Sequence, residues 1–435
     1  MSKPICIVSC PIDTCSGYGA RSRDFVKSLI KVKGEEWDIK ILSQRWGSTP
    51  FGALNTDNED DNDLKNRIIG SLTMSLPFQP DVWVQITVPN EFQPLGKFNI
   101  GVTAGIETTI CDPSWIDGCN RMDLNLVSSK HSENVFKTNG YQQKDPKTGR
   151  IVKEGKLEKP IEVLFEGADL SKYFKSDDLK DFDIYDDLKS IKENFCFLFV
   201  GHWLPGDFGE DRKNVGYMIK AFLEVFKNKK NKPALILKAS QGAPSIIDRD
   251  KILRKIEDIR KTVSGGDIPN IYLLHGDLYD EEINCIYNHP KVKAMVSFTK
   301  GEGFGRPLLE FSIIGKPIIA SGWSGHLDFL TPDLCGLVGG TLTNVHSSAH
   351  APNMLLKEAQ WFKPDDNQAG HAFLDIFDHY KKYQEKAKEL AYNNKRTFSL
   401  DKMTESLSGL ISKYAPEFPK VVELKLPKLK KVSDE

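Results

Sequence analysis

Short apolar runs alternate along the chain with segments in which apolar residues recur at helical spacing. In the first half this pattern predicts strands at Ile5–Cys10, Ile39–Ser43, Val82–Thr87, Phe98–Thr103, Leu124–Ser128 and Ile161–Phe165, and helices at Ala20–Val32, Asp63–Met74 and Ser132–Thr138. The polar stretch from Tyr141 to Pro160 predicts a loop or a small hairpin.

The alternation is more regular in the second half. The predicted strands are Phe195–Gly201, Ala234–Ala239, Ile271–His275, Ala294–Phe298 and Pro317–Ala320, and the predicted helices are Val215–Lys227, Ile246–Val263, Glu281–Tyr287, Pro307–Ile314, Ala372–Asn393 and Lys402–Lys413. Continuous apolar strands that alternate with amphipathic helices are typical of parallel sheets. The predicted fold class is therefore α/β, with two doubly wound, Rossmann-like parallel-sheet domains that face a cleft.

An acidic, apolar-poor stretch from Ser176 to Asp187 separates the two halves and predicts a linker or hinge. We place the first domain at residues 1–190 and the second at 191–400, and we assign 401–435 to a final helix and a tail. Ligands of doubly wound sheets bind beyond the carboxyl ends of the strands. The ligand site is therefore expected in the cleft between the domains.

Composition and charge exclude several classes of protein. Lys and Arg number 59 and Asp and Glu 60 among 435 residues, and this balance argues against a nucleic-acid binder. No apolar run approaches the roughly 20 residues that span a bilayer. The basic segment Lys425–Lys431 is interpreted as a solvated terminus in preference to a contact with a membrane surface. The 8 cysteines include no Cys-x-x-Cys pair and predict reduced thiols in a cytoplasmic protein.

The segment from Phe298 to Asp328 carries the clearest chemical pattern. A predicted strand leads into the loop Glu302-Gly303-Phe304-Gly305, and a helix follows whose first turn contains Pro307. The glycines let backbone N–H groups approach a ligand closely, and a helix N-terminus favours an anion such as a diphosphate.

Two carboxylates bracket this loop. Glu310 lies about one turn into the helix, where it can accept hydrogen bonds from both hydroxyls of a ribose. Glu302 can bind sugar hydroxyls or offset charge near a reacting carbon. The alternative for Glu310 by itself is a carboxylate that only complements the helix dipole; the complete group of residues favours a ligand site.

A second group of candidates follows the strand Phe195–Gly201. His202, Arg212 and Lys213 lie in the loop before the next helix, which Asn214 is expected to cap. A Lys–Arg pair in a loop is more often solvated. Its place at the carboxyl end of a parallel sheet instead favours contact with a diphosphate held in the cleft.

The segment Glu302–Glu310, with its continuation through Gly315 and Pro317, resembles the Glu-x7-Glu motif of the retaining glycosyltransferases of family 4, which have the GT-B fold. Four further segments are similar to that family: Gly201–Phe222, Asp123–Phe136, Glu166–Phe174 and Trp361–Asp365. The resemblance covers residues 120–400 well and the first 120 residues loosely.

The resemblance implies roles for the candidate residues. Glu310 should bind the nucleotide ribose and Glu302 the donor sugar, with the backbone of Gly303, Phe304 and Gly305 near the sugar or the diphosphate. Lys213 should neutralise the leaving diphosphate. The resemblance also implies that residues 1–190 bind the acceptor, that residues 191–400 bind the donor, and that the final helix crosses back to the first domain.

The chain departs from the family pattern at two places. His202 stands where the family often has Arg, so the second cationic contact is either Arg212 or a protonated His202. No His occurs at 103–107, where the family often supplies one, and Glu107 receives no role. Gly17 and Gly19 do not complete a dinucleotide-binding pattern; they fit a loop facing the diphosphate or acceptor and a flexible loop before a helix equally well.

The resemblance implies an enzyme, a retaining hexosyltransferase that moves a sugar from a nucleoside-diphosphate sugar to a hydroxyl of a glycan, lipid or small molecule. We expect no cofactor and no metal; His346 and His350 have metal-compatible spacing but lie in a predicted loop. The alternative is a catalytically inactive GT-B-like protein that binds nucleotide sugars or glycans. A nicotinamide-dependent dehydrogenase is disfavoured by the incomplete glycine pattern.

Overall fold

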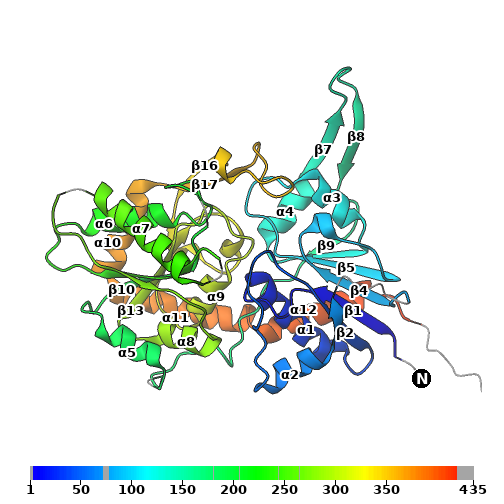
Figure 1. The fold of residues 1–435 in the computed structure, drawn as a ribbon, viewed down its shortest axis with the longest axis horizontal. Helices are drawn as coiled ribbons and strands as arrows, with labels where there is room; N and C mark the ends of the chain where they lie inside the picture. Colours follow the sequence, from blue (N-terminus) through cyan, green and yellow to red (C-terminus); the bar gives the residue numbers. More distant parts are fainter. Residues whose placement is uncertain are drawn as a thin grey trace, which may run out of the picture.

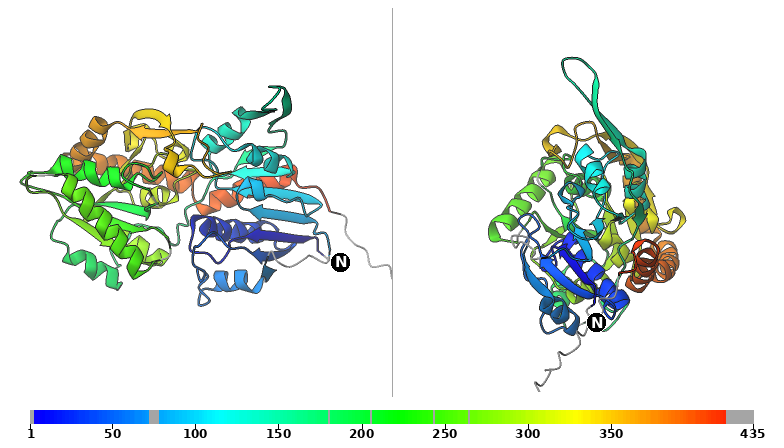
Figure 2. Two further views of the ribbon diagram at one scale, coloured as in Figure 1. Left: turned by 45° about the horizontal axis from the view of Figure 1, so that its top comes forward. Right: turned by 90° about the vertical axis from the view of Figure 1, so that its right-hand side faces the viewer.

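Two parallel β-sheets, one in each half of the chain, organise the molecule, which is described from a computed structural model (Figure 1). The described residues are 3–71, 78–179, 181–204, 206–242, 244–263 and 265–418, so the basic segment Lys425–Lys431 lies outside them. Both sheets are covered by helices on both faces, and the two resulting lobes lie side by side (Figure 2). The predicted α/β class with two doubly wound sheets is confirmed.

The first sheet has the strand order β3-β2-β1-β4-β5-β6-β9, and every pair in it is parallel. Its strands are β1 (Ile5–Cys10), β2 (Asp38–Ser43), β3 (Ile68–Ser71), β4 (Val82–Ile86), β5 (Phe98–Thr103), β6 (Leu124–Val127) and β9 (Ile161–Val163). One face packs against α1 (Gly17–Lys33), α2 (Glu59–Asn66) and α12 (Leu400–Tyr414), and the other against α3 (Pro113–Asn120) and α4 (Lys130–Thr138).

The second sheet has the order β12-β11-β10-β13-β14-β15 and is also wholly parallel. Its strands are β10 (Cys196–His202), β11 (Ala234–Ser240), β12 (Ile271–Leu274), β13 (Val292–Ser297), β14 (Ile318–Ser321) and β15 (Gly336–Val338). One face packs against α5 (Asp183–Ser190), α8 (Asp280–Asn288), α9 (Arg306–Ile313) and α11 (Tyr380–Thr397), and the other against α6 (Val215–Phe226), α7 (Ile246–Thr262) and α10 (Asp366–Asp378). Burial on both faces explains why these strands read as continuous apolar runs.

The last described helix, α12, follows the second domain in sequence but packs on the first. Met403, Leu407 and Ile411 are buried in the core beneath the first sheet. The hydroxyls of Ser28 on α1 and Thr404 on α12 lie 2.8 Å apart. The chain therefore connects the two lobes twice, once before α5 and once before α12.

Two of the predicted helices differ from the structure. The helix predicted at Asp63–Met74 is instead α2 followed by β3, because Ile68 and Ile69 are β-branched residues in a strand that pairs with β2; the end of that prediction, residues 72–77, lies outside the described residues. The helix predicted at Ala372–Asn393 is two helices, α10 and α11, with a break at His379.

The predicted linker Ser176–Asp187 is only partly a linker. Its end forms the start of α5, whose Ile184 and Leu188 are buried against the second sheet. Two apolar residues four positions apart are enough to dock one helical face, although acidic residues surround them. The acidic composition therefore describes the outer face of α5.

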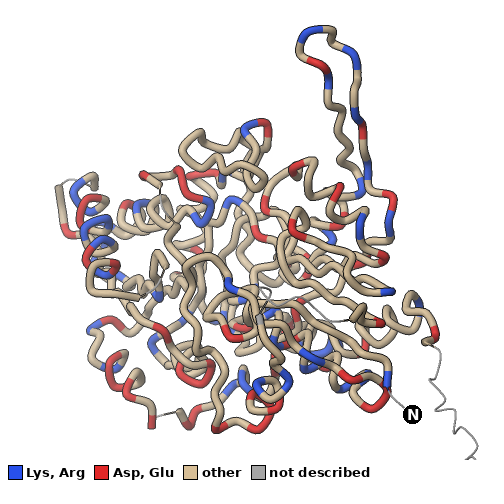
Figure 3. Tube along the Cα trace, turned by 45° about the vertical axis from the view of Figure 1, so that its right-hand side comes forward, with Lys and Arg blue, Asp and Glu red and all other residues tan. Residues whose placement is uncertain are grey.

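Two antiparallel ribbons extend beyond the sheets. The polar stretch after α4 forms a hairpin of β7 (Gly140–Lys144) and β8 (Ile151–Lys156), which projects from the first domain (Figure 1). The second ribbon pairs β16 (Gly340–Asn344) with β17 (Gln360–Pro364). Basic and acidic positions are interspersed along the described chain (Figure 3), in keeping with its balanced composition.

Candidate active site

The two domains meet where loops leave the carboxyl ends of the strands. The loop after β13 contacts the loop after β5, and two glycines make this approach close. A Cβ atom on Gly301 would lie 2.0 Å from the carbonyl oxygen of Glu107, and one on Gly303 would lie 2.3 Å from that of Ala104. Larger residues at either position would force the domains apart. Gly303, which the sequence singled out for a ligand, thus also permits the domain contact.

The loop after β13 ends in a sharp turn into α9. Gly305 precedes the helix with a φ of 94°, a left-handed conformation that favours glycine. Phe304 is buried and its ring lies 5.0 Å from that of Phe329, so its side chain belongs to the core. From Gly303 to Gly305, only the backbone is therefore available to a ligand, as the predicted helix N-terminal site requires.

Glu302 lies between two cations from the loop after β10. Its Oε1 is 2.5 Å from Nζ of Lys213, and its Oε2 is 3.3 Å from Nη1 of Arg212. Burial by itself would raise the pKa of the carboxyl, but the charges of Lys213 and Arg212 outweigh that effect and lower it to about 2. Glu302 is therefore ionised at neutral pH, and the predicted residues Glu302, Lys213 and Arg212 form one cluster.

Arg212 connects the cluster to the first domain. Its guanidinium donates to the carbonyl of Gly301 at 2.6 Å and lies 3.4 Å from Oε1 of Glu107. Glu107, to which the sequence assigned no role, is thus an ionic partner across the domain boundary. Burial lowers the pKa of Lys213, although the charge of Glu302 opposes this. The cationic character of the site is divided between a bridging arginine and a partly buried lysine.

Asn214 occupies the position before α6, but its side chain does not cap the helix as predicted. Its φ is 55°, and its side-chain amide donates to the carbonyl of Phe298 at 3.2 Å. Its backbone N–H instead donates to Oδ1 of Asp211 at 2.8 Å. Asn214 therefore ties the loop that carries Lys213 to the loop that carries Glu302.

His202 ends β10, in front of the cluster. Its Nδ1 lies 3.3 Å from the hydroxyl of Ser240. Desolvation lowers the pKa of the imidazole, and the nearby charge of Lys213 lowers it further. A neutral ring at neutral pH disfavours the interpretation in which a protonated His202 supplies the second cationic contact, and favours Arg212 for that contact.

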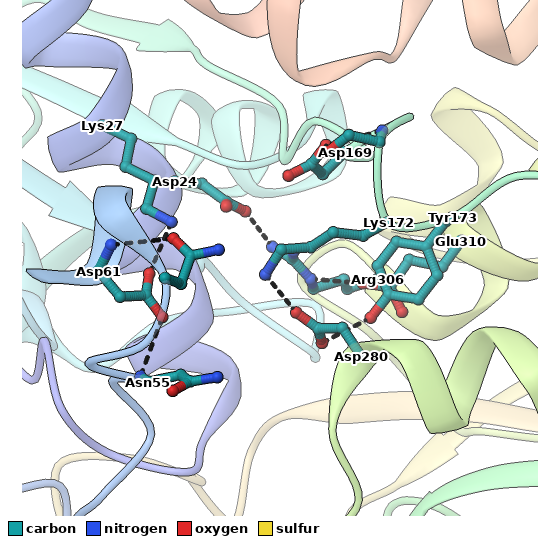
Figure 4. Close-up of polar contacts among 12 residues, drawn as sticks. Asp24, Lys27, Asn55, Asp61, Asp169, Lys172, Tyr173, Asp280, Arg306 and Glu310 are labelled. Atoms are coloured by element: carbon teal, nitrogen blue, oxygen red, sulfur yellow. Dashed lines mark hydrogen bonds and ion pairs between the residues drawn. The ribbon is translucent and has the colours of Figure 1, made fainter. Parts of the chain in front are cut away.

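Glu310 belongs to a second ionic cluster at the domain boundary (Figure 4), with partners that differ from those of Glu302. Nε of Arg306, one turn earlier on α9, donates to its Oε1 at 2.7 Å, and the same guanidinium pairs with Asp24 on α1 of the first domain. Burial raises the pKa of Glu310 to about 7 in spite of the charge of Arg306, and Asp280 contributes in the same direction. This carboxyl is therefore poised to change its charge near neutral pH.

Gly17 and Gly19 lie in the first turn of α1. Ser16 caps this helix, and its hydroxyl accepts from the N–H of Gly19 at 3.0 Å. A Cβ on Gly19 would lie 2.1 Å from the carbonyl oxygen of Thr14, whereas one on Gly17 would meet no atom within 4 Å. Gly19 is thus required by packing of the turn, and Gly17 is free to face the space before the helix.

Two histidines that line the domain boundary received little or no attention at the sequence level. His131, at the start of α4, packs its ring 4.7 Å from that of Trp323, and its Nε2 is buried without a hydrogen-bond partner. His326 donates from Nε2 to the carbonyl of Ser321 at 2.6 Å, and its buried Nδ1 is likewise unpaired. His131 lies four residues after the end of β6, and a search of the segments after each strand for polar residues would have found it.

Across the described part of the chain, no group of three or more His, Cys, Asp or Glu residues is arranged to hold a metal ion. His346 contacts Ser348, and His350 lies 3.2 Å from the carbonyl of Val345. Among the described helices, none combines the length and hydrophobicity needed to cross a bilayer.

The fold of this chain, but not its sequence, is similar to that of known proteins. No sequence profile of a known family matches the chain, and no curated protein matches it. Several solved structures superpose over nearly the whole chain. Sucrose-phosphate synthase from Thermosynechococcus elongatus is 11% identical with a TM-score of 0.58, covering 94% of this chain and 98% of its own.

Two other solved structures are similar to the same extent. HepE from Anabaena, in complex with UDP and glucose, is 12% identical with a TM-score of 0.59, and the match covers 94% of this chain and 100% of that protein. WaaG, a glycosyltransferase involved in lipopolysaccharide biosynthesis, is 12% identical with a TM-score of 0.56 and coverages of 94% and 99%. Together with the two facing parallel sheets, these similarities show that the chain has the GT-B fold of glycosyltransferases.

Proposed function

We propose that the protein is a retaining glycosyltransferase that uses a nucleoside-diphosphate sugar as donor and a hydroxyl of a glycan, lipid or small molecule as acceptor. One observation carries this proposal: Lys213, Arg212 and Glu302 converge beside the glycine loop where the carboxyl edges of both sheets meet. Similar structures include one solved in complex with UDP-glucose, which is consistent with a nucleotide-sugar donor.

In the proposed reaction, the bond between the anomeric carbon and the diphosphate oxygen breaks, and its electron pair leaves with the diphosphate. The acceptor oxygen forms the new bond on the same face, and its proton passes to the leaving diphosphate. Lys213, Arg212 and the backbone N–H groups at the start of α9 would stabilise the charge that develops there. A diphosphate would compete with Glu302 for Lys213 and free that carboxylate to bind sugar hydroxyls.

Glu310 and the first domain complete the proposed assignment. Glu310 would hold the ribose, and loops of the first domain would hold the acceptor and exclude water that otherwise hydrolyses the donor. Because protein cations would neutralise the diphosphate, we propose that turnover needs neither a metal ion nor a cofactor. Activity that survives chelation by EDTA supports this part, and activity restored only by a divalent cation contradicts it.

The test is a screen of UDP-, GDP- and ADP-sugars in which release of the nucleoside diphosphate is measured, with and without simple acceptors. We expect release from at least one donor and a loss of about 100-fold or more in Lys213→Ala. Lys381→Ala, which changes an exposed lysine on α11, is the matched control. The anomeric configuration of the product, read by NMR, decides between retention and inversion.

The alternative, a GT-B-like protein that binds nucleotide sugars or glycans without transfer, is favoured by two observations. His202 is neutral where the similar family often has Arg, and Lys213 is already paired with a carboxylate. Calorimetry that shows nucleoside-diphosphate binding, together with no release from any donor, supports this alternative. If the protein neither binds a nucleoside diphosphate nor releases one from any donor, both proposed functions are contradicted.

A further inference from the structure

A cavity of about 490 Å³ lies in the second domain, outside the cluster around Glu302. It is bounded by α6, the loop before it, the start of α10 and the ribbon β16–β17, which lie close together in Figure 1. Its size suits a small molecule. Neither Lys213 nor Glu310 lines it, and all of its lining residues come from the second half of the chain.

Lys300 is a buried cation in this cavity. Its side chain is 6% exposed, its ammonium lies 4.2 Å from the centre of the Trp361 ring, and it donates to the carbonyl of Gly209. No carboxylate among the described residues forms an ion pair with it. Buried lysines rarely lack a charged partner. Desolvation lowers the pKa of Lys300 to about 8, so the ammonium persists at neutral pH without a counter-ion in contact.

Lys363 brings a second cation to the same cavity. It lies two residues after Trp361 on β17, and alternation along a strand places both side chains on one face. The N–H of Phe362, between them, donates to the carbonyl of Lys300 at 2.8 Å, so the two segments run side by side. The charge of Lys363 lowers the pKa of Lys300, whereas the more distant charges of Asp211 and Glu210, which form no ion pair with it, raise that pKa. An anion bound between the two lysines would relieve the repulsion between them.

The rest of the cavity offers ring faces and hydrogen-bonding groups. Phe208 is half exposed at the rim, and Tyr217 lines the wall with a buried hydroxyl that faces the carboxylate of Asp366. Asn344 and Asp366 add an amide and a carboxylate. Aromatic faces together with convergent polar groups suit the C–H faces and hydroxyls of a sugar ring.

We propose that this cavity binds a phosphorylated sugar, with the phosphate between Lys300 and Lys363 and the ring against Phe208 and Tyr217. Lysines bind phosphate as point charges, and the two ammonium groups come from segments joined by backbone hydrogen bonding. The proposal concerns binding alone and does not depend on glycosyl transfer.

The cavity is also connected to the candidate active site. The N–H of Lys300 donates to the carbonyl of Arg212 at 2.8 Å, and the guanidinium of Arg212 donates in turn to the carbonyl of Gly301. A phosphate that competes with Gly209 for the Lys300 ammonium would therefore act on the loop that leads to Arg212. This effect on the active site, unlike binding, rests on the proposed function.

Calorimetry with glucose 1-phosphate, glucose 6-phosphate, mannose 6-phosphate and fructose 6-phosphate tests the site. We expect at least one of them to bind with one-to-one stoichiometry and at least 10-fold more tightly than inorganic phosphate or glucose. Lys363→Glu, at an exposed position, should weaken binding by at least 10-fold, and Lys300→Met should do the same while keeping its packing on Trp361. Lys381→Ala should bind as the wild type does.

Lys213→Ala separates this cavity from the diphosphate site. Binding that is kept in Lys213→Ala and lost in Lys363→Glu supports the proposal. Binding that is lost in Lys213→Ala but kept in Lys363→Glu places the phosphate in the cleft and overturns it, as does the absence of binding by the whole panel. Circular dichroism of each variant shows whether it is folded, and a folded Lys363→Glu is sufficient for the decision.

The coupling is measured by the affinity for the best-binding nucleoside diphosphate with and without saturating sugar phosphate. We expect a change of about fivefold, the lower end of common coupling factors, and the same factor in the reverse experiment. An unchanged nucleotide affinity contradicts the coupling and leaves the calorimetric site intact. Failure of every nucleoside diphosphate to bind counts against the proposed function and not against the cavity.

Discussion

The ammonium nitrogen of Lys213 lies 2.5 Å from Oε1 of Glu302. The residue proposed to contact the diphosphate is therefore paired with the residue proposed to contact the donor sugar. Each neutralises a charge that burial would otherwise make costly. The pair is therefore both a part of the candidate site and a contribution to the stability of the fold.

Glu302→Gln tests that contribution through its pH dependence. A folded pKa of about 2, below the ordinary value, means that ionised Glu302 stabilises the fold above its ordinary pKa and that this stabilisation is lost as pH falls toward 2. We expect the free energy of unfolding of the variant, measured in urea at pH 7, to be about 3 kcal/mol lower than that of wild type. This difference between the two proteins should become smaller below about pH 4.5. Equal stability at pH 7 contradicts this; the exposed Glu405→Gln is the control and should change nothing measurable.

Glu310 should make nucleotide binding depend on pH near neutrality. Its pKa is raised to about 7 by burial, and only its ionised form can accept hydrogen bonds from both ribose hydroxyls with both oxygens. We expect affinity for the nucleoside diphosphate to rise as pH increases from 6 to 8, by up to about 10-fold. Calorimetry at several pH values measures this.

The carboxyl of Glu310 should make folding stability fall as pH rises, whereas it makes nucleotide affinity rise. A carboxyl whose folded pKa is raised stabilises the fold while protonated, and that stabilisation is lost as pH rises through about 7. Glu310→Gln should therefore bind nucleotide weakly and without pH dependence, while its stability at pH 8 matches or exceeds that of wild type. A strongly destabilised variant would show that Arg306 needs a charged partner there.

Asp24 joins the domains through Arg306, and its side chain is only 11% exposed. Asp24→Asn should destabilise the protein by about 2 kcal/mol, because the partly buried guanidinium of Arg306 then loses its ionic partner from the first domain. Asp401→Asn is the matched control: it breaks the pair with Lys31, but at a side chain that is 78% exposed. Urea unfolding should show a larger loss of stability for Asp24→Asn than for Asp401→Asn. Equal losses would contradict the idea that burial makes the pair with Arg306 important.

Gly303→Ala should impair transfer without unfolding either domain. The added Cβ would lie 2.3 Å from the carbonyl oxygen of Ala104, so the loops that meet across the boundary must separate. We expect a loss of at least 10-fold in donor turnover with an unchanged circular dichroism spectrum, because a displacement near 1 Å is costly at a reacting centre.

Gly17→Ala is the matched control for this steric argument. A Cβ at Gly17 meets no atom within 4 Å, so its fold and thermal midpoint should equal those of wild type. If Gly303→Ala keeps full turnover, the close domain contact at Ala104 is not needed for the reaction.

Most of the sheet strands could be predicted because each depends on a local run of apolar residues. The predicted bounds Ile5–Cys10 and Phe98–Thr103 agree with β1 and β5. Prediction failed at β3, where a helix-like pattern ran into the two isoleucines at 68 and 69, and α5 was hidden by its acidic outer face. At both places, packing against a neighbouring element decided the outcome.

In the candidate site, too, the features that depend on local sequence could be predicted and those that depend on long-range contacts could not. The turn at Gly305, the helix that begins next to it and the carboxylate Glu310 could be placed from sequence, because glycine conformation and helical spacing are local properties. The partner of Arg306 from the first domain could not be predicted, since Asp24 lies 282 positions earlier in the chain. The unpaired nitrogens of His131 and His326 likewise become visible only in three dimensions.

The sequence by itself determined that this protein has two parallel sheets and a glycine loop flanked by carboxylates, because these features follow from side-chain period and backbone preference within short segments. Only the tertiary structure decided that Lys213 pairs with Glu302, that Asp24 bridges to Arg306, and that Lys300 is buried against Trp361. Contacts between distant residues depend on how two packed domains and a returning helix are oriented. The packing of many side chains sets that orientation, and no local pattern encodes it.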